Sequence, residues 1–330
     1  MAADVLSDLL RTVRLTGATF FDVAAREPWV AEQPTADMVL PKILPGAEHL
    51  ISYHVVSAGK CFASILDGAK NGDPVSLEAG EVIVFTHGSP HVMASAPGMR
   101  AAPVKREDYD AKTAGQRPFR LNVGTDGPLT QLVCGFLACD ARPFNPLLEH
   151  LPPIIKAKDP DKDGNGWLGQ LVRLGVTESQ EKRAGGDSVL AKLSELMFIE
   201  VLRQHVEAMP PEEAGWLAGV RDPFVGKALS FMHEDPARDW TIESLAGEVG
   251  LSRSVLAERF TDLLGIPPMQ YLAKWRMQIA SGLLSSGNAT MAQIAAAIGY
   301  ESEAAFSRAF KKMAGLPPSA WRERALNAAG

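Results

Sequence analysis

Side chains that can read the edges of DNA bases occur at corresponding places in two segments near the end of the chain. Arg308 can donate two hydrogen bonds to a guanine, and Glu258 or Glu303 can accept one from a cytosine. The candidates for base contacts are Arg253, Ser254, Ala257, Glu258, Glu303, Ala304, Ser307 and Arg308. The candidates for phosphate contacts are the neighbouring basic residues Arg259, Lys274, Lys311 and Lys312. Each side chain taken alone can also be an ordinary solvated group, so the prediction depends on the elements that hold it.

An internal repeat indicates what these elements are. Residues 242–268 and 291–318 align at an offset of 49 and then of 50 residues, with one residue inserted in the turn of the second copy. In each copy, a small alanine precedes a glycine that can take the positive φ of a tight turn, and a serine then caps the next helix. The matched positions are Ala246, Gly250, Ser252, Leu256, Phe260 and Gly265, and then Ala295, Gly299, Ser302, Phe306, Phe310 and Gly315. One copy alone would fit an ordinary helical bundle about as well, but two copies in register predict two helix-turn-helix units.

The segment between the copies is predicted to be a single helix. Residues 269–287 contain no proline, so they can form a helix of about 17 residues that would be roughly 25 Å long. A rigid helix of that length can hold two recognition helices about one DNA turn, roughly 34 Å, apart. We therefore expect residues 222–330 to form an all-helical DNA-binding domain that binds DNA by itself, more weakly than the whole chain.

Length and charge favour a second, acidic domain. A chain of 330 residues is long for a single core. Residues 222–326 carry 11 basic and 11 acidic residues, whereas residues 1–221 carry 22 basic and 28 acidic ones, which is the whole net charge of -6. The N-terminal part is therefore not expected to contact phosphate. The chain has an odd number of cysteines, which favours a reducing compartment. It has no segment typical of a signal peptide or a membrane span. We therefore expect a cytoplasmic protein that does not contact membranes.

The first half of the chain has the pattern of β structure. Short apolar runs at 49–59, 60–68, 80–88 and 129–139 are separated by turn residues, which favours a sandwich or barrel, and residues 100–128 are expected to form a long surface loop. Two helices are expected after Pro153, the second from Asp187 or Ser188 to Pro210. The fold class is α+β with two domains: residues 1–208 are a barrel with helices, 209–221 a linker and 222–330 the helix-turn-helix domain.

The C-terminal part resembles the AraC/XylS family of bacterial regulators. The resemblance covers residues 222–325 and rests on the segments GLSRSVLAERF, GIPPMQYLAKWRMQIASGLL and IAAAIGYESEAAFSRAFKKMAGLPPSAWR. It implies that the second helix of each copy enters the major groove. Glu258 stands where the family often has a basic residue, so the resemblance supports base reading less well for the first copy than for the second.

Residues 7–140 resemble the cupin-type sensor domain of many such regulators, which implies a jelly-roll barrel. The segment GEVIVFTHGSPH, residues 80–91, is similar to the second cupin motif, with Thr86 where proline is usual. In the first motif His54 fits, but Ser52 stands where another histidine belongs. A cupin metal centre needs about three ligands, and only His54 and His91 fit well. Further candidates are His87, Cys61 and Cys134. We therefore expect no cofactor and a small-molecule effector in the barrel, with a divalent metal as the alternative.

These patterns together predict a sequence-specific transcriptional regulator. Its expected partners are double-stranded DNA, a small effector, a second copy of the chain and, if it activates transcription, RNA polymerase. The apolar stripe from Val189 to Val206 is expected to help pair two chains, with Leu193 and Met197 in the contact. One alternative is a cupin metal-dependent enzyme fused to a DNA-binding module. Another is a constitutive DNA binder whose barrel only dimerises.

Overall fold

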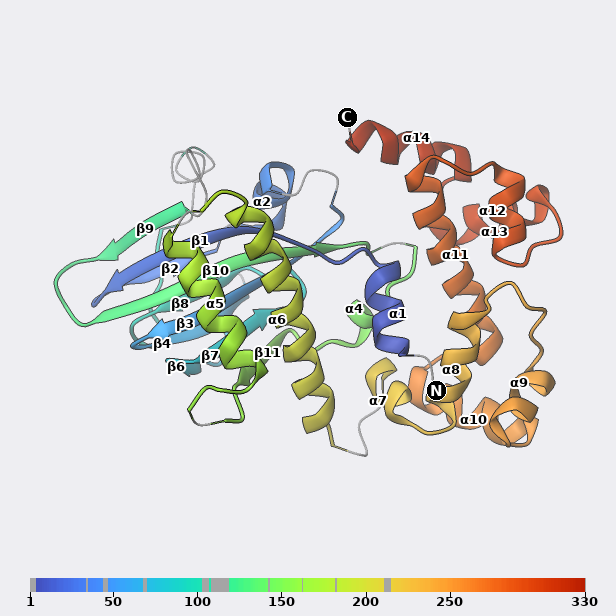
Figure 1. Cartoon of the computed structure of the whole chain (residues 1–330), viewed down its shortest axis with the longest axis horizontal. Coiled ribbons are helices and arrows are strands. Elements are labelled where there is room, and N and C mark those ends of the chain that lie inside the picture. The colour runs from blue at the N-terminus through green and yellow to red at the C-terminus, as the bar shows by residue number, and fades with distance from the viewer. Residues whose placement is uncertain are drawn as a thin grey trace. The chain divides into compact units, whose positions relative to one another are not determined.

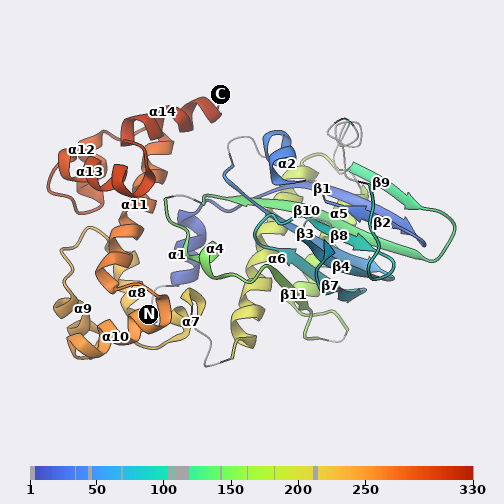
Figure 2. The ribbon, with the colours of Figure 1, turned by 180° about the vertical axis from the view of Figure 1, so that it is seen from behind.

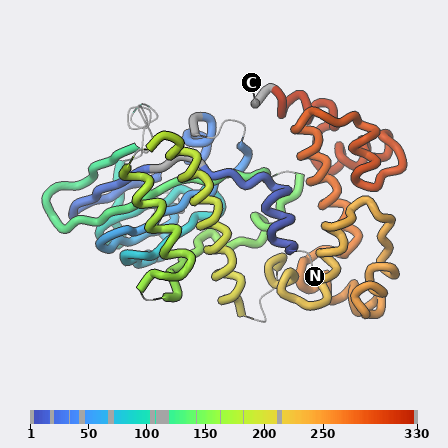
Figure 3. Tube along the Cα trace, in the orientation of Figure 1, coloured from blue at the N-terminus to red at the C-terminus, as the bar shows by residue number. Residues whose placement is uncertain are grey.

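The computed structural model divides the chain into two compact units. The sheet unit consists of Leu15–Cys139 and Pro152–Ala208, and the helical unit consists of Met1–Arg14, Asp140–Leu151 and Met209–Gly330. The structure describes residues 4–33, 35–43, 47–67, 70–102, 107, 119–141, 143–161, 163–181, 183–210 and 215–329. Figures 1 and 2 show the elements from opposite sides, and Figure 3 follows the path of the chain.

Two sheets form the framework of the sheet unit. The larger sheet has the strand order β11-β7-β3-β10-β1-β9, and the smaller has the order β2-β8-β4-β5 with β6 paired to β4. The strands are β1 (Thr16–Arg26), β2 (Val30–Glu32), β3 (His49–Ala58), β4 (Lys60–Asp67), β5 (Lys70–Asn71), β6 (Val75–Glu78), β7 (Glu81–Phe85), β8 (His91–Ala94), β9 (Phe119–Gly124), β10 (Leu129–Cys139) and β11 (Ile154–Lys158). The two sheets confirm the predicted β structure of this part of the chain.

The larger sheet is covered on both faces, because its central strands carry apolar side chains on both. On one face, Leu132 and Phe136 of β10 join a core with Met93 of the smaller sheet. On the other face lie α5 (Trp167–Glu181) and α6 (Gly186–Ala208), which run side by side (Figure 1). Gly17 of β1 lets α6 approach closely, since a Cβ there would lie 2.3 Å from the carbonyl oxygen of Ala191. The short helix α2 (Ala36–Ile43) completes the unit.

The surface loop expected over residues 100–128 is partly wrong. Residues 119–124 form β9, which pairs in parallel with β1 at the edge of the larger sheet. Its side chains alternate between less and more exposed positions, as expected of an edge strand with one covered face. Residues 103–106 and 108–118 of the expected loop lie outside the described part of the chain.

The helical unit contains both copies of the repeat. Its helices are α1 (Val5–Thr12), α4 (Pro146–His150), α7 (Trp216–Arg221), α8 (Val225–Glu234), α9 (Ile242–Val249), α10 (Arg253–Leu264), α11 (Pro268–Ser286), α12 (Met291–Ala297), α13 (Glu303–Ala314) and α14 (Pro318–Ala329). The first helix-turn-helix unit is α9 with α10, and the second is α12 with α13. Between them α11 has 19 residues, which corresponds to about 28 Å. The predicted single connecting helix is thus confirmed.

The helical unit includes more of the chain than the sequence suggested. Leu9 and Val13, at α1, are fully buried, and α1 contacts α8 and α11. Within the segment 209–221, where we expected a linker, α7 buries Trp216, whose indole N–H donates to the Tyr271 hydroxyl at 3.0 Å. These large apolar side chains complete a core that the first repeat lacks alone. Independent folding of residues 1–208 and 222–330 stays a prediction.

No helix in the part of the chain that the structure describes has the length and apolar character needed to cross a membrane.

Candidate functional site

The two turns have the backbone that the repeat predicted. Gly250 and Gly299 have φ of 79° and 75°, values that favour glycine. The next residue in each copy, Leu251 or Tyr300, donates its backbone N–H to the carbonyl of Ala246 or Ala295, respectively. This bond spans the end of the first helix and fixes the direction of the chain into the second. The inserted residue follows this bond, so it lengthens the second turn without changing the way the first helix ends.

The second helix of each unit is capped and anchored as predicted. Ser252 accepts from the N–H of Val255, and Ser302 accepts from the N–H of Ala305. The inward pairs, Leu256 with Phe260 and Phe306 with Phe310, are fully buried. All eight candidates for base contacts therefore lie at the first two turns of α10 and α13, and each is exposed or half-buried. Reading of specific bases by these residues stays a prediction.

The cations of the first unit are engaged in contacts within the protein. Arg253 pairs with Glu243 at 2.8 Å, and Arg259 pairs with Asp222 at 2.5 Å. Burial raises the pKa of Asp222, but hydrogen bonds from Arg259 and from the N–H groups of Val225 and Phe224 outweigh it, so the pKa is lowered overall. Arg259 is thus a weaker phosphate candidate than the sequence suggested.

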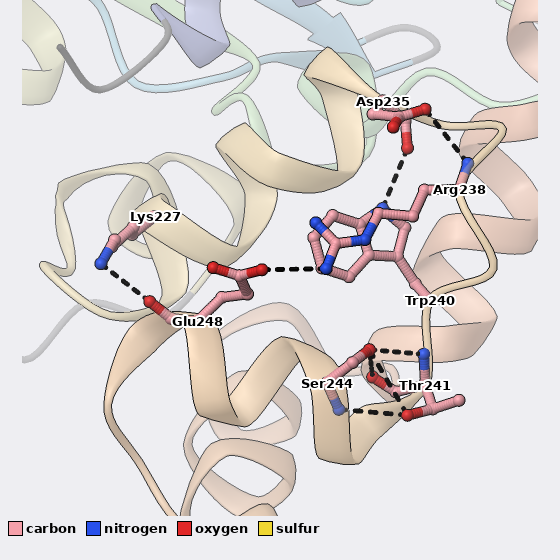
Figure 4. A network of polar contacts seen from close by, with 7 residues as sticks. All are labelled: Lys227, Asp235, Arg238, Trp240, Thr241, Ser244 and Glu248. Carbon is pink, nitrogen blue, oxygen red and sulfur yellow. Dashed lines mark hydrogen bonds and ion pairs between the residues drawn. The ribbon is translucent and has the colours of Figure 1, made fainter.

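Further basic residues of the first unit hold α8 and α9 together (Figure 4). Arg238 lies over the ring of Trp240, 3.9 Å from its centroid, and donates to Glu248 at 2.9 Å. Lys227 donates to the backbone carbonyl of Glu248 at 2.8 Å. Thr241 begins α9 with a reciprocal capping box. These charges therefore support the scaffold that presents α10.

The basic residues of α13, in contrast, do not form such ion pairs and hydrogen bonds within the described part of the chain. Arg308, Lys311 and Lys312 are exposed, and within the described part of the chain they make no ion pair or hydrogen bond through their side chains. Lys274 differs, since it is half-buried and lies 4.8 Å from the ring centroid of Phe144. Of the four phosphate candidates, Lys311 and Lys312 thus have no side-chain partner within the described part of the chain. Arg259 and Lys274 each contact another side chain of the protein.

One exposed residue of α10 was not singled out from the sequence. Val255 is 46% exposed, although it is a large apolar side chain in the first turn of a helix whose inward face is Leu256 and Phe260. Its position between Ser254 and the inward Leu256 could have indicated this, since a valine there has no core to enter. An exposed valine at this place is suited to contact a thymine methyl.

A second candidate site is a cavity of about 220 Å³ between the two sheets of the sheet unit. Its lining is mainly apolar and includes Phe21, Trp29, Met93, Leu132 and Phe136. His54 of β3 and His91 of β8 also line it, and they come from opposite sheets. Their Nε2 atoms are 2.8 Å apart. The structure therefore brings together the two histidines that the cupin resemblance singled out.

The three other candidates for effector or metal binding do not all lie at this cavity. Cys134 lines the cavity, whereas Cys61 lies in the apolar core and His87 is exposed beside His49. Burial raises the pKa of Cys61 to about 12 and raises that of Cys134 as well, so both thiols are protonated at neutral pH. Among the described residues, no group of three histidine, cysteine, aspartate or glutamate side chains is placed to hold a metal ion. Two imidazoles in contact through their Nε2 atoms do not fit the three-ligand centre of a cupin enzyme.

Comparisons with known proteins match two parts of the chain to two protein families. Residues 4–207 match a protein family described as Cupin, and residues 245–324 match one described as Helix-turn-helix domain. A protein of Streptomyces lividans named "Putative AraC-like transcription regulator" is 34% identical over 278 residues, which cover 84% of this chain and 88% of the relative. A protein of the same name from Streptomyces antibioticus is 32% identical over 85% of this chain and 89% of the relative. The "HTH-type transcriptional regulator AlkR" of Acinetobacter baylyi is 25% identical over 97% of this chain and 99% of the relative.

Proposed function

The chain belongs to the family of AraC-like transcription regulators, and we propose that it acts as a dimer whose binding to specific DNA sites is controlled by a small effector in the cavity of the sheet unit. As a member of this family it is a DNA-binding transcription regulator. The relatives named above are regulators, which is consistent with a chain that is not an enzyme. A cytoplasmic location is part of the proposal, as is contact with RNA polymerase if the regulator is an activator.

The observation that carries DNA reading is the pair of exposed helix starts, α10 and α13, at the two ends of the rigid helix α11. Apart from the exposed Val255, both helices present small or polar residues outward and large apolar residues inward. This arrangement suits insertion into two major grooves one helical turn apart.

Selection of bound sequences from a random DNA pool, followed by hydroxyl-radical footprinting, tests this. We expect two protected half-sites about 10 base pairs apart for each chain. A single protected block would contradict the use of both units. Lys60→Ala, an exposed change in the sheet unit, is a matched control that should leave the footprint unchanged.

The outer face of α5 and α6 supports dimerisation. Six large apolar residues are exposed in the described part of the chain, and four of them lie on these two neighbouring helices. They are Trp167, Leu174, Val189 and Leu196. We expected Met197 in the contact from the sequence, but Met197 is 5% exposed and packs inward, so a lysine there would unfold the unit.

The test of dimerisation therefore uses Val189→Lys with Leu196→Lys, which lie two turns apart on one helix face. We expect a folded monomer in sedimentation and weaker binding to paired DNA sites. Leu174→Lys should have the same effect. A dimer that persists in both variants would place the contact elsewhere.

A further inference from the structure

The cavity of the sheet unit has a size that limits its ligand. Its volume of about 220 Å³ is below the roughly 300–1,000 Å³ of sites for drug-sized ligands. It is larger than an engineered cavity of about 150 Å³ that holds benzene. A single six-membered ring with a short substituent therefore fits.

Hydrogen bonds fix the protonation of the two histidines. The Nδ1 atom of His91 lies 2.8 Å from the carbonyl oxygen of Ser89, so it carries the hydrogen and donates. Burial lowers the pKa of His91 to about 4 and lowers that of His54 well below its usual value, so both rings are neutral at neutral pH. The Nε2 atom of His91 is then an acceptor, and the Nε2 of His54 must donate to it. His54 Nδ1 is left as an acceptor.

This acceptor has no partner. His54 is 6% exposed, and its Nδ1 atom makes no hydrogen bond to any described residue. Two other residues of the lining also have buried polar atoms without a partner, Trp29 at Nε1 and Gln33 at Nε2, and both of these are donors. Buried polar atoms without partners are costly and uncommon. All three atoms belong to residues that line one cavity, where a polar group of a bound molecule would supply a partner.

The described lining of the cavity favours a neutral ligand. Among the described residues that line the cavity there is no lysine or arginine to pair with an anion. Glu32 is the one carboxylate of the lining, and its Oε1 pairs with Nε of Arg100 at 2.6 Å. The hydrogen bond from Arg100 lowers the pKa of Glu32, so this carboxylate is already compensated and does not call for a cationic ligand.

We propose that the cavity binds a neutral, mainly apolar molecule of about the size of a substituted benzene, with a hydroxyl group that donates to His54 Nδ1 and accepts from Trp29 or Gln33. A hydroxyl satisfies both requirements with one atom, since it is a donor and an acceptor. The ligand class is therefore a simple phenol. This inference rests on the proposed effector site and specifies its chemistry.

The test uses three fluorinated probes: 4-fluorophenol, 4-fluorotoluene, which has the same number of heavy atoms, and the anionic 4-fluorobenzoate. Fluorine NMR titrations of the full chain give the dissociation constant of each. We expect 4-fluorophenol to bind about fivefold more tightly than 4-fluorotoluene, the ratio that corresponds to one net hydrogen bond, and 4-fluorobenzoate not to bind.

Variants at His54 connect the preference to the acceptor. His54→Leu should remove the preference for the phenol over the toluene. His54→Asn should retain it, because an amide oxygen on Cγ stands close to the place of Nδ1. His87→Leu, which changes a histidine outside the cavity, is the control. Thermal melting of each variant verifies that it is folded.

The outcomes separate this inference from the proposed function. If 4-fluorotoluene binds as tightly as the phenol, or if His54→Leu keeps the preference, the phenol class is wrong while the cavity remains a ligand site. The same holds if the benzoate binds best. If none of the probes binds and the probes leave DNA affinity unchanged, both the phenol class and the effector site are overturned.

Discussion

In the first helix-turn-helix unit Arg253 and Arg259 are each paired with a carboxylate, whereas Arg308, Lys311 and Lys312 of the second unit make no ion pair in the described structure. The helix α10 also balances its two arginines with Glu258 and Asp262, while α13 sets three basic residues against Glu303. The backbones of the two units nevertheless share their glycine turns, serine caps and inward pairs. The two units therefore share their backbone geometry but differ in charge, and the second unit carries most of the positive charge that can attract phosphate.

The two units also differ in what supports them. The second unit has a core of its own, formed by residues between Met277 and Trp321. The first unit packs against α7 and α8, which lie outside the repeat, and these helices are in turn contacted by α4 and α1. The N–H of Gly215, for example, donates to the backbone carbonyl of Leu263 in α10 at 2.7 Å. The first unit is thus built into the rest of the chain, and the second is self-contained.

Truncation of the chain should produce the largest difference in stability between the two helix-turn-helix units. A fragment of residues 222–330 lacks α1, α4 and α7, and the loss of Trp216 alone should cost about 3–5 kcal/mol, as for other large buried aromatic side chains. We expect α9 and α10 to lose protection against hydrogen exchange while α12 and α13 keep theirs. DNA binding by the fragment should then come mainly from the second unit.

Single substitutions in the full chain give matched controls for the truncation. Trp216→Ala should loosen α8 to α10, and Trp321→Ala should loosen α12 to α14, since each tryptophan is buried in one core. Equal loss of protection in both units, from either substitution, would show that the two cores are not separate.

The sequence allowed the repeat to be predicted in detail because its requirements are local. A glycine with positive φ, a serine cap and an inward pair four residues apart each depend on a few neighbouring residues. The pairing of Arg259 with Asp222 joins residues 37 positions apart, and it exists only because α10 packs near the start of α8. The contact of His54 with His91 also spans 37 positions, and only the cupin resemblance pointed to it. The contributions of α1 and α4 could not be predicted, since α1 contacts α8 and α11 and α4 contacts α7, all far along the chain from them.

Arg308→Ala should cost about 1–3 kcal/mol at the preferred DNA site and relax the choice of one base pair. Its guanidinium is exposed and has no partner within the described part of the chain, and Ala304 beside it leaves room for close approach to the groove. Titrations on the selected site and on a scrambled site measure this. Equal weakening on both sites would make Arg308 a phosphate contact only. Arg253→Ala, whose side chain is paired with Glu243, should cost less.

Acidification should loosen the first unit before the second. His233 of α8 stacks on Trp275 with ring centroids 3.8 Å apart, and burial lowers its pKa from 6.5 to about 3. The unfolded state therefore binds more protons between these values, so stability is complete above pH 6.5 and falls as the pH drops towards 3. At pH 5 the loss is about 2 kcal/mol. The core cluster of the second unit contains no such group among its described members.

Hydrogen exchange at pH 7 and pH 5, corrected for the intrinsic rates, measures this difference between the units. Protection in α8 and α9 should fall relative to α12 and α13. His233→Phe keeps a stacked ring without a titrating group, so the difference should disappear in this variant. A pH effect of equal size in both units would rule out His233 as its cause.

The smallest effects concern single surface cations, and they test directly whether the second unit supplies the phosphate contacts. Lys312→Ala should weaken binding to matched and scrambled DNA alike and reduce the salt dependence of log K by about one unit, as expected for one lost phosphate contact. Arg259→Ala should leave the salt dependence unchanged, because its charge is already paired with Asp222. It should instead lower the stability of the first unit by at most about 1 kcal/mol, since the arginine is partly exposed and solvent screens the pair. Titrations at several salt concentrations, together with urea unfolding, measure both quantities. If Arg259→Ala reduces the salt dependence as much as Lys312→Ala does, the ion pair opens on DNA, and the two units share the phosphate backbone equally.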